Sequence, residues 1–268
     1  MRKFLSFVII YCSLINPIFA SEQTNHIDGK NISKTFINIG DKGISKLKAS
    51  DLEGAKKLDF TNAGATDEGL KALLKILPDG LEELIFTNCS LTYDGINYME
   101  HYPLPLSLKL LDFTHNKLGI DGTKLLISFL PPGLINLRLN INQIDDGFTA
   151  EEASHLPPML KRLELAMNRI NDTGIKALEP YLKNNPNLTA LYLYKNPIGE
   201  VGTKILTDLC FSFADDYYCT RQLSAPPPKP RLKPKPEHII RQMRNITDYK
   251  EYAARVVYKT RFSEQIQV

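Results

Sequence analysis

The residues best suited to chemistry do not form a recognised catalytic arrangement. Two acidic pairs, Asp145-Asp146 and Glu151-Glu152, carry the carboxylates that general acid and base catalysis would use. Both pairs lie in or next to a predicted turn into a helix, where acidic side chains ordinarily stabilise the helix start. The sequence contains no GxSxG, no HExxH, no phosphate-binding glycine loop and no catalytic cysteine signature. We therefore expect a protein that is not an enzyme and needs no cofactor.

Metal binding is not expected either. The histidines fall at no spacing typical of metal ligands. They are His26, His101, His115, His155 and His238.

A repeat of 26 to 28 residues dominates the chain and must position whatever functional side chains it has. Between Ala55 and Cys210, six copies have apolar residues at positions one, four and six. Position nine of each copy is Asn, Cys or Ala. Clear copies are LINLRLNINQI, LKRLELAMNRI and LTALYLYKNPI. The residues at position nine are Ala63, Cys89, Asn116, Asn142, Asn168 and Asn196. A fixed period of this size indicates a solenoid in which each repeat is one coil.

Each copy begins with strand-like alternation and continues with a helical pattern. In one copy Leu163 and Leu165 alternate with Glu164, and the segment IKALEPYL follows with helical spacing. One strand and one helix cannot bury their apolar sides alone, so the coils must stack. The chain bends after the strand, and an Asn amide there can bond backbone groups of the adjacent coil. The predicted structural ladder therefore consists of Cys89, Asn116, Asn142, Asn168 and Asn196.

These residues resemble the ribonuclease-inhibitor-like class of leucine-rich repeats, with its LxxLxLxxN/C core and a glycine that opens the helix. The glycines are Gly69, Gly95, Gly122, Gly174 and Gly202, while Gly147 comes one residue early. The resemblance covers residues 36 to 210 and implies an α/β solenoid, or horseshoe, with parallel strands on the concave face and helices on the convex face. Phe60, Phe86 and Phe113 stand where that class usually has Leu.

The chain divides into five predicted segments. Residues 1–20 are a signal peptide, 21–54 an N-terminal cap with a degenerate half-repeat, 55–209 the six repeats, 210–236 an end cap with a Pro-rich linker, and 237–268 a basic amphipathic helical tail. The half-repeat is predicted at FINIGDKGISKL, because Gly43 lies 26 residues before Gly69.

The first segment reads as an export signal. Arg2 and Lys3 precede the apolar run FLSFVIIYCSLI, and cleavage is expected after Ala20. An uncleaved membrane anchor is the alternative, because Ile18 is larger than the residue usually found there. We therefore expect export, with the mature chain secreted or periplasmic.

Export bears on the cysteines. Cys12 leaves with the signal peptide and Cys89 occupies a ladder position. Cys210 and Cys219 remain, nine residues apart at the end of the last repeat, where a disulfide could seal the solenoid. The alternative is two unpaired thiols.

The tail differs in charge from the solenoid. Residues 21–220 carry 20 basic and 26 acidic side chains, whereas residues 221–268 carry 11 basic and 4 acidic ones. After the proline-rich segment APPPKPRLKPKPE, apolar residues recur at helical spacing among cations. The tail either packs on the solenoid or is partly disordered, or it binds an anionic membrane or cell-wall surface. It carries no recognised nucleic-acid motif, so we expect no nucleic-acid partner.

Strand positions that point away from the core are the candidate contact surface. The predicted partner-binding residues are Asp59, Ile85, Asp112, Arg138, Glu164, Met167, Tyr192 and Tyr194. Exposed tyrosines are frequent anchors of protein interfaces. The alternative is that the tail covers the two tyrosines.

These features predict an exported, monomeric leucine-rich-repeat module that binds a protein partner through its concave face. The resemblance implies a secreted or host-directed bacterial effector. The alternative function is an envelope-associated structural or adhesion protein that its basic tail attaches to the surface.

Overall fold

The computed structural model describes residues 22–28, 31–209, 211–214 and 218–221. The chain divides into two units, Met1–Arg221 and Gln222–Val268, and all of the described residues lie in the first. The predicted signal peptide, the proline-rich linker and the helical tail lie outside the described residues. Within the described part of the chain, no helix is long and apolar enough to span a bilayer.

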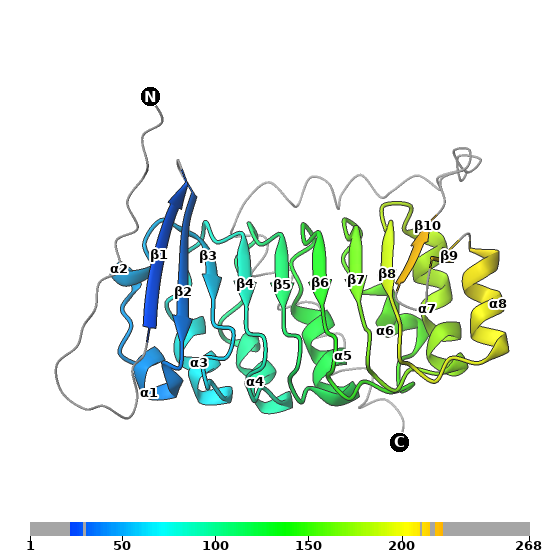
Figure 1. Cartoon of the computed structure of the whole chain (residues 1–268), viewed down its shortest axis with the longest axis horizontal. Coiled ribbons are helices and arrows are strands. Elements are labelled where there is room, and N and C mark those ends of the chain that lie inside the picture. The colour runs from blue at the N-terminus through cyan, green and yellow to red at the C-terminus, as the bar shows by residue number, and fades with distance from the viewer. Residues whose placement is uncertain (1–21, 29–30, 210, 215–217, 222–268) are drawn as a thin grey trace, which may run out of the picture. The chain divides into compact units, whose positions relative to one another are not determined.

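The six copies of the repeat each form a strand followed by a helix, and the strands lie side by side in chain order (Figure 1). The strands are β3 (Ala55–Asp59), β4 (Glu83–Ile85), β5 (Leu110–Asp112), β6 (Asn136–Arg138), β7 (Arg162–Glu164) and β8 (Ala190–Tyr192). The helices are α3 (Asp67–Leu74), α4 (Tyr93–Asn97) with the 3₁₀ turn η1 (Tyr98–Glu100), α5 (Gly119–Phe129), α6 (Ala150–Ser154), α7 (Asp172–Asn184) and α8 (Glu200–Asp208).

Before the first full coil come β1 (Glu22–Asp28), β2 (Asn31–Ile37), α1 (Gly40–Ile44) and α2 (Ala49–Leu52), and after the last come β9 (Phe211–Ala214) and β10 (Tyr218–Arg221). The ten strands form one sheet in the order β1-β2-β3-β4-β5-β6-β7-β8-β10-β9. From β2 to β8 all neighbours are parallel. The predicted fold class is confirmed, because the structure is an α/β leucine-rich-repeat solenoid.

A hairpin closes each end of the sheet, a feature that the repeat pattern did not predict. At the start, β1 pairs antiparallel with β2. At the other end, β10 pairs antiparallel with both β8 and β9. The backbone of Cys219 lies opposite Leu191, whereas Cys210 and the side chain of Cys219 lie outside the described residues, so their disulfide stays a prediction.

The core uses the repeat positions that the sequence marked as apolar. Four phenylalanines, Phe36, Phe60, Phe86 and Phe113, are fully buried. The rings of the first three stack with centroids 4.7 and 4.8 Å apart, and Phe113 meets Phe86 edge to face at 6.1 Å. Such pairs contribute about 0.5–1.5 kcal/mol beyond the burial of their area. The phenylalanines that replace the usual Leu therefore form, together with Phe36, a continuous aromatic stack through the first coils.

The asparagines at position nine bond each coil to the preceding one. The Asn168 amide donates to the carbonyl oxygens of Leu139 at 3.0 Å and Leu165 at 2.9 Å. Its Oδ1 accepts from the backbone N–H groups of Asn142 at 2.9 Å and Ile144 at 3.1 Å. Asn116, Asn142 and Asn196 make the corresponding contacts with the preceding coil. The buried bends thus obtain partners for backbone groups that would otherwise be unsatisfied.

Acidic residues that precede or begin the helices also link neighbouring coils. Asp41 accepts from Thr66 N at 2.8 Å and from Thr66 Oγ1 at 2.6 Å. Thr66 itself accepts from the backbone of Glu68 as the N-cap of α3. The glycine in the first turn permits this approach, since a Cβ on Gly69 would lie 2.5 Å from Asp41 Oδ1. Asp67, Asp146 and Asp172 bond the following coil in the same way.

Replacing Asn168 by Ala tests the ladder. The substitution leaves several buried backbone groups without their partners, so the free energy of unfolding should fall by about 1–3 kcal/mol. Urea unfolding followed by circular dichroism measures this change. The matched control is Asn184→Ala, at an exposed position at the end of α7, which should change stability by less than about 0.5 kcal/mol. Equal effects of the two substitutions would argue against a ladder role.

Candidate functional site

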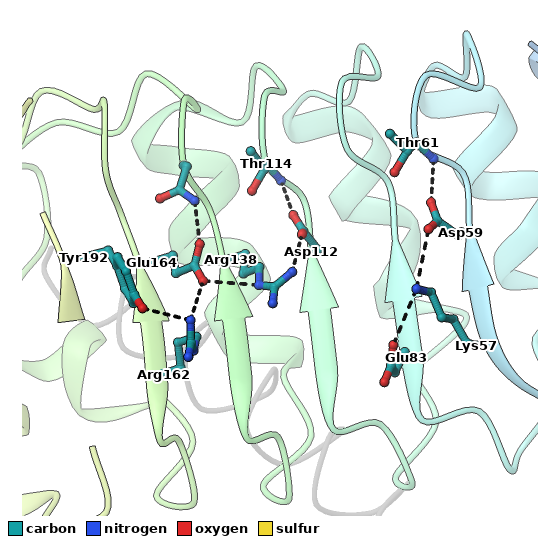
Figure 2. Close-up of polar contacts among 11 residues, drawn as sticks. Lys57, Asp59, Thr61, Glu83, Asp112, Thr114, Arg138, Arg162, Glu164 and Tyr192 are labelled. Carbon is teal, nitrogen blue, oxygen red and sulfur yellow. Dashed lines mark hydrogen bonds and ion pairs between the residues drawn. The ribbon is translucent and has the colours of Figure 1, made fainter. Parts of the chain in front are cut away.

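The side chains on the strand face away from the helices form the candidate site, which we call the sheet face. It consists of positions three, five and seven of each coil. Position five holds Asp59, Ile85, Asp112, Arg138, Glu164 and Tyr192, all in register across the parallel strands. Figure 2 shows most of these residues with their polar neighbours.

A line of alternating charges crosses the sheet face from β5 to β7. Arg138 lies between two carboxylates, with Nη1 3.2 Å from Asp112 Oδ2 and Nε 3.2 Å from Glu164 Oε1 (Figure 2). The Nε contact is at ion-pair distance but is not aligned as a hydrogen bond. The amide of Asn140 donates to Glu164 Oε2 at 2.8 Å, and the backbone N–H of Thr114 donates to Asp112 at 2.9 Å. Each charge is therefore held by its neighbours.

The network ends on an aromatic side chain. Arg162 Nη1 lies 3.6 Å from Glu164 Oε1 and donates to the Tyr192 hydroxyl at 2.9 Å. The Arg162 guanidinium carbon is 5.3 Å from the centre of the Tyr192 ring, within cation–π distance. Arg162 thus orients Tyr192 toward the charged line. The position-three arginine was not among the predicted site residues, because only positions five and seven of the strand had been taken to point away from the core.

A separate polar group occupies the first coils. Lys57 Nζ lies 3.7 Å from Asp59 Oδ2 and 4.0 Å from Glu83 Oε2, and Asp59 accepts from the Thr61 backbone at 3.0 Å (Figure 2). These ion pairs are partly exposed, and such pairs contribute about 0–1 kcal/mol.

The predicted contact residues differ in the surface they offer. Ile85 is 8% exposed and Asp112 6%. Met167 is 38% exposed, and Tyr192 and Tyr194 are half-buried and make contacts of their own. Ile85 and Asp112 therefore offer a partner little surface, whereas Met167, Tyr192 and Tyr194 remain accessible.

A row of unusual backbone conformations borders the sheet face. Position eight of every coil has a positive φ of 54–59°, a region that favours Gly, Asn and Asp. The residues are Asn62, Asn88, His115, Ile141, Met167 and Lys195. Early coils place asparagine there, which tolerates this conformation, but Ile141 is β-branched and is strained by it. The sequence pattern gave no sign of this requirement, because side chains at position eight vary freely.

The groups considered for catalysis have structural contacts. Asp145 accepts from the Gly147 backbone, and Glu152 forms the capping box of α6 with Thr149. Burial raises the pKa of the Cys89 thiol, which donates to the Phe60 carbonyl at 3.4 Å, so its reactive thiolate form is disfavoured. Within the described residues, no group of three His, Cys, Asp or Glu side chains is placed to hold a metal ion.

Comparison with known proteins identifies one leucine-rich repeat in the chain. Residues 157–178, which hold β7 and the first half of α7, match the family model described as Leucine Rich repeat. A solved structure titled "Crystal structure of TLR13-ssRNA13 complex" is similar with 18% sequence identity and a TM-score of 0.35, over 63% of this chain and 29% of that one. The chain thus spans less than a third of that similar chain. No curated protein matches the sequence.

Replacing Ile141 by Asn tests the strain at position eight. A left-handed conformation costs most residues about 1–2 kcal/mol, whereas Asn adopts it readily. Despite losing a half-buried apolar side chain, Ile141→Asn should raise the free energy of unfolding by about 1 kcal/mol in urea unfolding. Ile135→Asn is the control, since Ile135 is also half-buried but lacks the positive φ. A loss of stability at both positions would contradict the assignment of strain.

Proposed function

We propose that the protein is an exported leucine-rich-repeat module of the ribonuclease-inhibitor-like class that binds a protein partner. On this proposal its mature chain acts as a monomer, secreted or periplasmic, and serves as a bacterial effector directed at a host protein. Binding uses the sheet face, which the resemblance makes concave, and involves no catalytic step.

The pre-ordered sheet face carries this proposal. Asp112, Arg138 and Glu164 are fixed by their neighbours, so little side-chain freedom remains to be lost when a partner docks. The face then changes toward Tyr192, Tyr194 and Met167, which are residue types that often dominate binding energy. A rigid charged region beside an aromatic one suits recognition of a folded protein surface.

Replacing Tyr192 and Tyr194 together by Ala tests the sheet face. Truncating aromatic anchors at an interface typically costs about 2 kcal/mol or more each, so partner capture should fall strongly. The measurement is an affinity pull-down with residues 21–268 from bacterial and eukaryotic lysates, with quantification of the partner retained by wild type. Tyr93→Ala with Tyr102→Ala, on the helix side, is the matched control. Undiminished capture by the Tyr192 and Tyr194 variant would place the contact elsewhere.

The charge of the C-terminal segment favours a second candidate function. Residues 221–268 carry 11 basic against 4 acidic side chains, and each cation near an anionic lipid surface contributes about 1 kcal/mol. Through this segment the protein would act as an envelope-associated structural or adhesion protein.

A chain ending at Ser224 tests the second candidate. Its association with anionic vesicles should be lost relative to the chain of residues 21–268, and added salt should release the longer chain because screening shortens the range of attraction. Vesicle co-sedimentation measures both effects. Association that survives truncation and high salt would assign the contact to the solenoid.

A further inference from the structure

The sheet face has already used most of its own charges. Arg138 and Arg162 are paired with carboxylates, and Lys57 lies between two more. A charged partner that docks there must compete with these internal contacts. Groups still able to bond a partner therefore have to lie beside the network.

Such groups occur at the turns that follow β5, β7 and β8. Lys117 and Arg169 occupy position ten of their coils, and Lys195 occupies position eight. All three are exposed. Within the part of the chain that the structure describes, none of them has an ion pair or a side-chain hydrogen bond. His115, at position eight of its coil, is also exposed.

Backbone hydrogen bonds place these turns directly beside one another. The N–H of His115 donates to Asn140 O at 2.8 Å, that of Ile141 to Ala166 O at 3.0 Å, and that of Met167 to Tyr194 O at 2.8 Å. The strand-to-strand pairing thus continues into the turns. We call the surface formed by His115, Lys117, Ile141, Met167, Arg169 and Lys195 the corner row.

Three carboxylates that follow these turns in the chain accept hydrogen bonds from backbone groups of the fold. Asp145 accepts from Gly147 N, and Asp146 from Asn171 N. Asp172 accepts from Gly199 and Gly202. The cations of the row are therefore left without an acidic side chain of their own in the described structure.

The row also exposes apolar side chains at an energetic cost. Met167 is 38% exposed and Ile141 is half-buried, and both have a positive φ of 55–56°. Neither the strain nor the exposure stabilises the fold. Strained residues tend to persist where they serve binding.

We propose that the corner row is the recognition site for an acidic segment of the partner protein. Carboxylates of that segment pair with Lys117, Arg169 and Lys195, while one of its apolar side chains packs on Ile141 and Met167. This inference rests on the proposed protein-binding function and names the chemistry of the partner.

Selection from a library of short randomised peptides tests the proposal. The immobilised chain of residues 21–268 is the target, and the library is first cleared on a synthetic peptide of residues 226–268 to remove binders of the basic tail. We expect enriched peptides to combine Asp or Glu with one apolar residue. Enrichment of neutral or basic peptides would overturn the proposed chemistry while leaving protein binding intact.

Substitutions then locate the site. In titrations of the most enriched peptide, labelled with fluorescein, the variant Lys117→Gln, Arg169→Gln, Lys195→Gln should bind about tenfold more weakly, as expected from losing three exposed ion pairs. The control Lys109→Gln, Lys161→Gln, Lys176→Gln removes the same charge from exposed positions elsewhere and should bind like wild type. Equal weakening in both variants, or none, would overturn the site.

Ile141→Asn separates recognition from folding. This variant should bind the same peptide more weakly and have a higher melting temperature. A purely structural role of Ile141 would not produce that combination. If no peptide is enriched, the corner-row proposal fails. The proposed function is judged separately, by the pull-down with the Tyr192 and Tyr194 variant.

Discussion

The structure depends on satisfying the backbone where each coil turns out of its strand. That turn is buried between neighbouring coils, so water cannot bond its peptide groups, and each unsatisfied group would cost about 1–3 kcal/mol. The amide of Asn168 donates to carbonyl groups of its own coil and of the preceding coil, and its oxygen accepts from a backbone N–H of the preceding coil. An amide offers two donors and an acceptor in one short side chain, so its recurrence at position nine helps to hold the coils in their stacked arrangement.

This constraint also sets the geometry of the outer surfaces. Because successive coils stack in register, Asp112, Arg138 and Glu164 lie opposite one another on adjacent strands, where their ion pairs can form. On the helix side the same spacing lets Asp41 reach Thr66 in the next coil. Charged and capping contacts are consequences of the stacking and add modestly to it, since exposed pairs contribute little.

The repeat and its elements were predictable because they depend on periodicity. Position nine marked the bends, and positions one, four and six marked the core, as the buried Leu134, Leu137 and Leu139 show. The predicted LRR architecture is confirmed on this basis. The terminal hairpins were not predictable from the repeat, because β1, β9 and β10 lie outside its copies and each occurs once.

Site residues were harder to infer from the sequence. The repeat pattern indicates which way a side chain points, but not how deeply it is buried or which residues it contacts. Ile85 and Tyr192 share a position, yet Ile85 is almost fully covered and Tyr192 is oriented by Arg162 from position three. The left-handed conformation at position eight was likewise invisible, since Asn88 and Ile141 occupy it alike. Burial, pairing and backbone strain arise between coils, whereas sequence patterns are read along one coil.

Backbone strain at the corner row is compatible with a stable fold, because other residues provide the stability. The ladder and the core stabilise every coil, so one turn can carry a β-branched residue at positive φ without disrupting its neighbours. Paired charges on the sheet face keep that surface rigid, while the unpaired cations beside it remain able to form new contacts. A solenoid can therefore vary its recognition chemistry at position eight without altering the residues that determine its stacking.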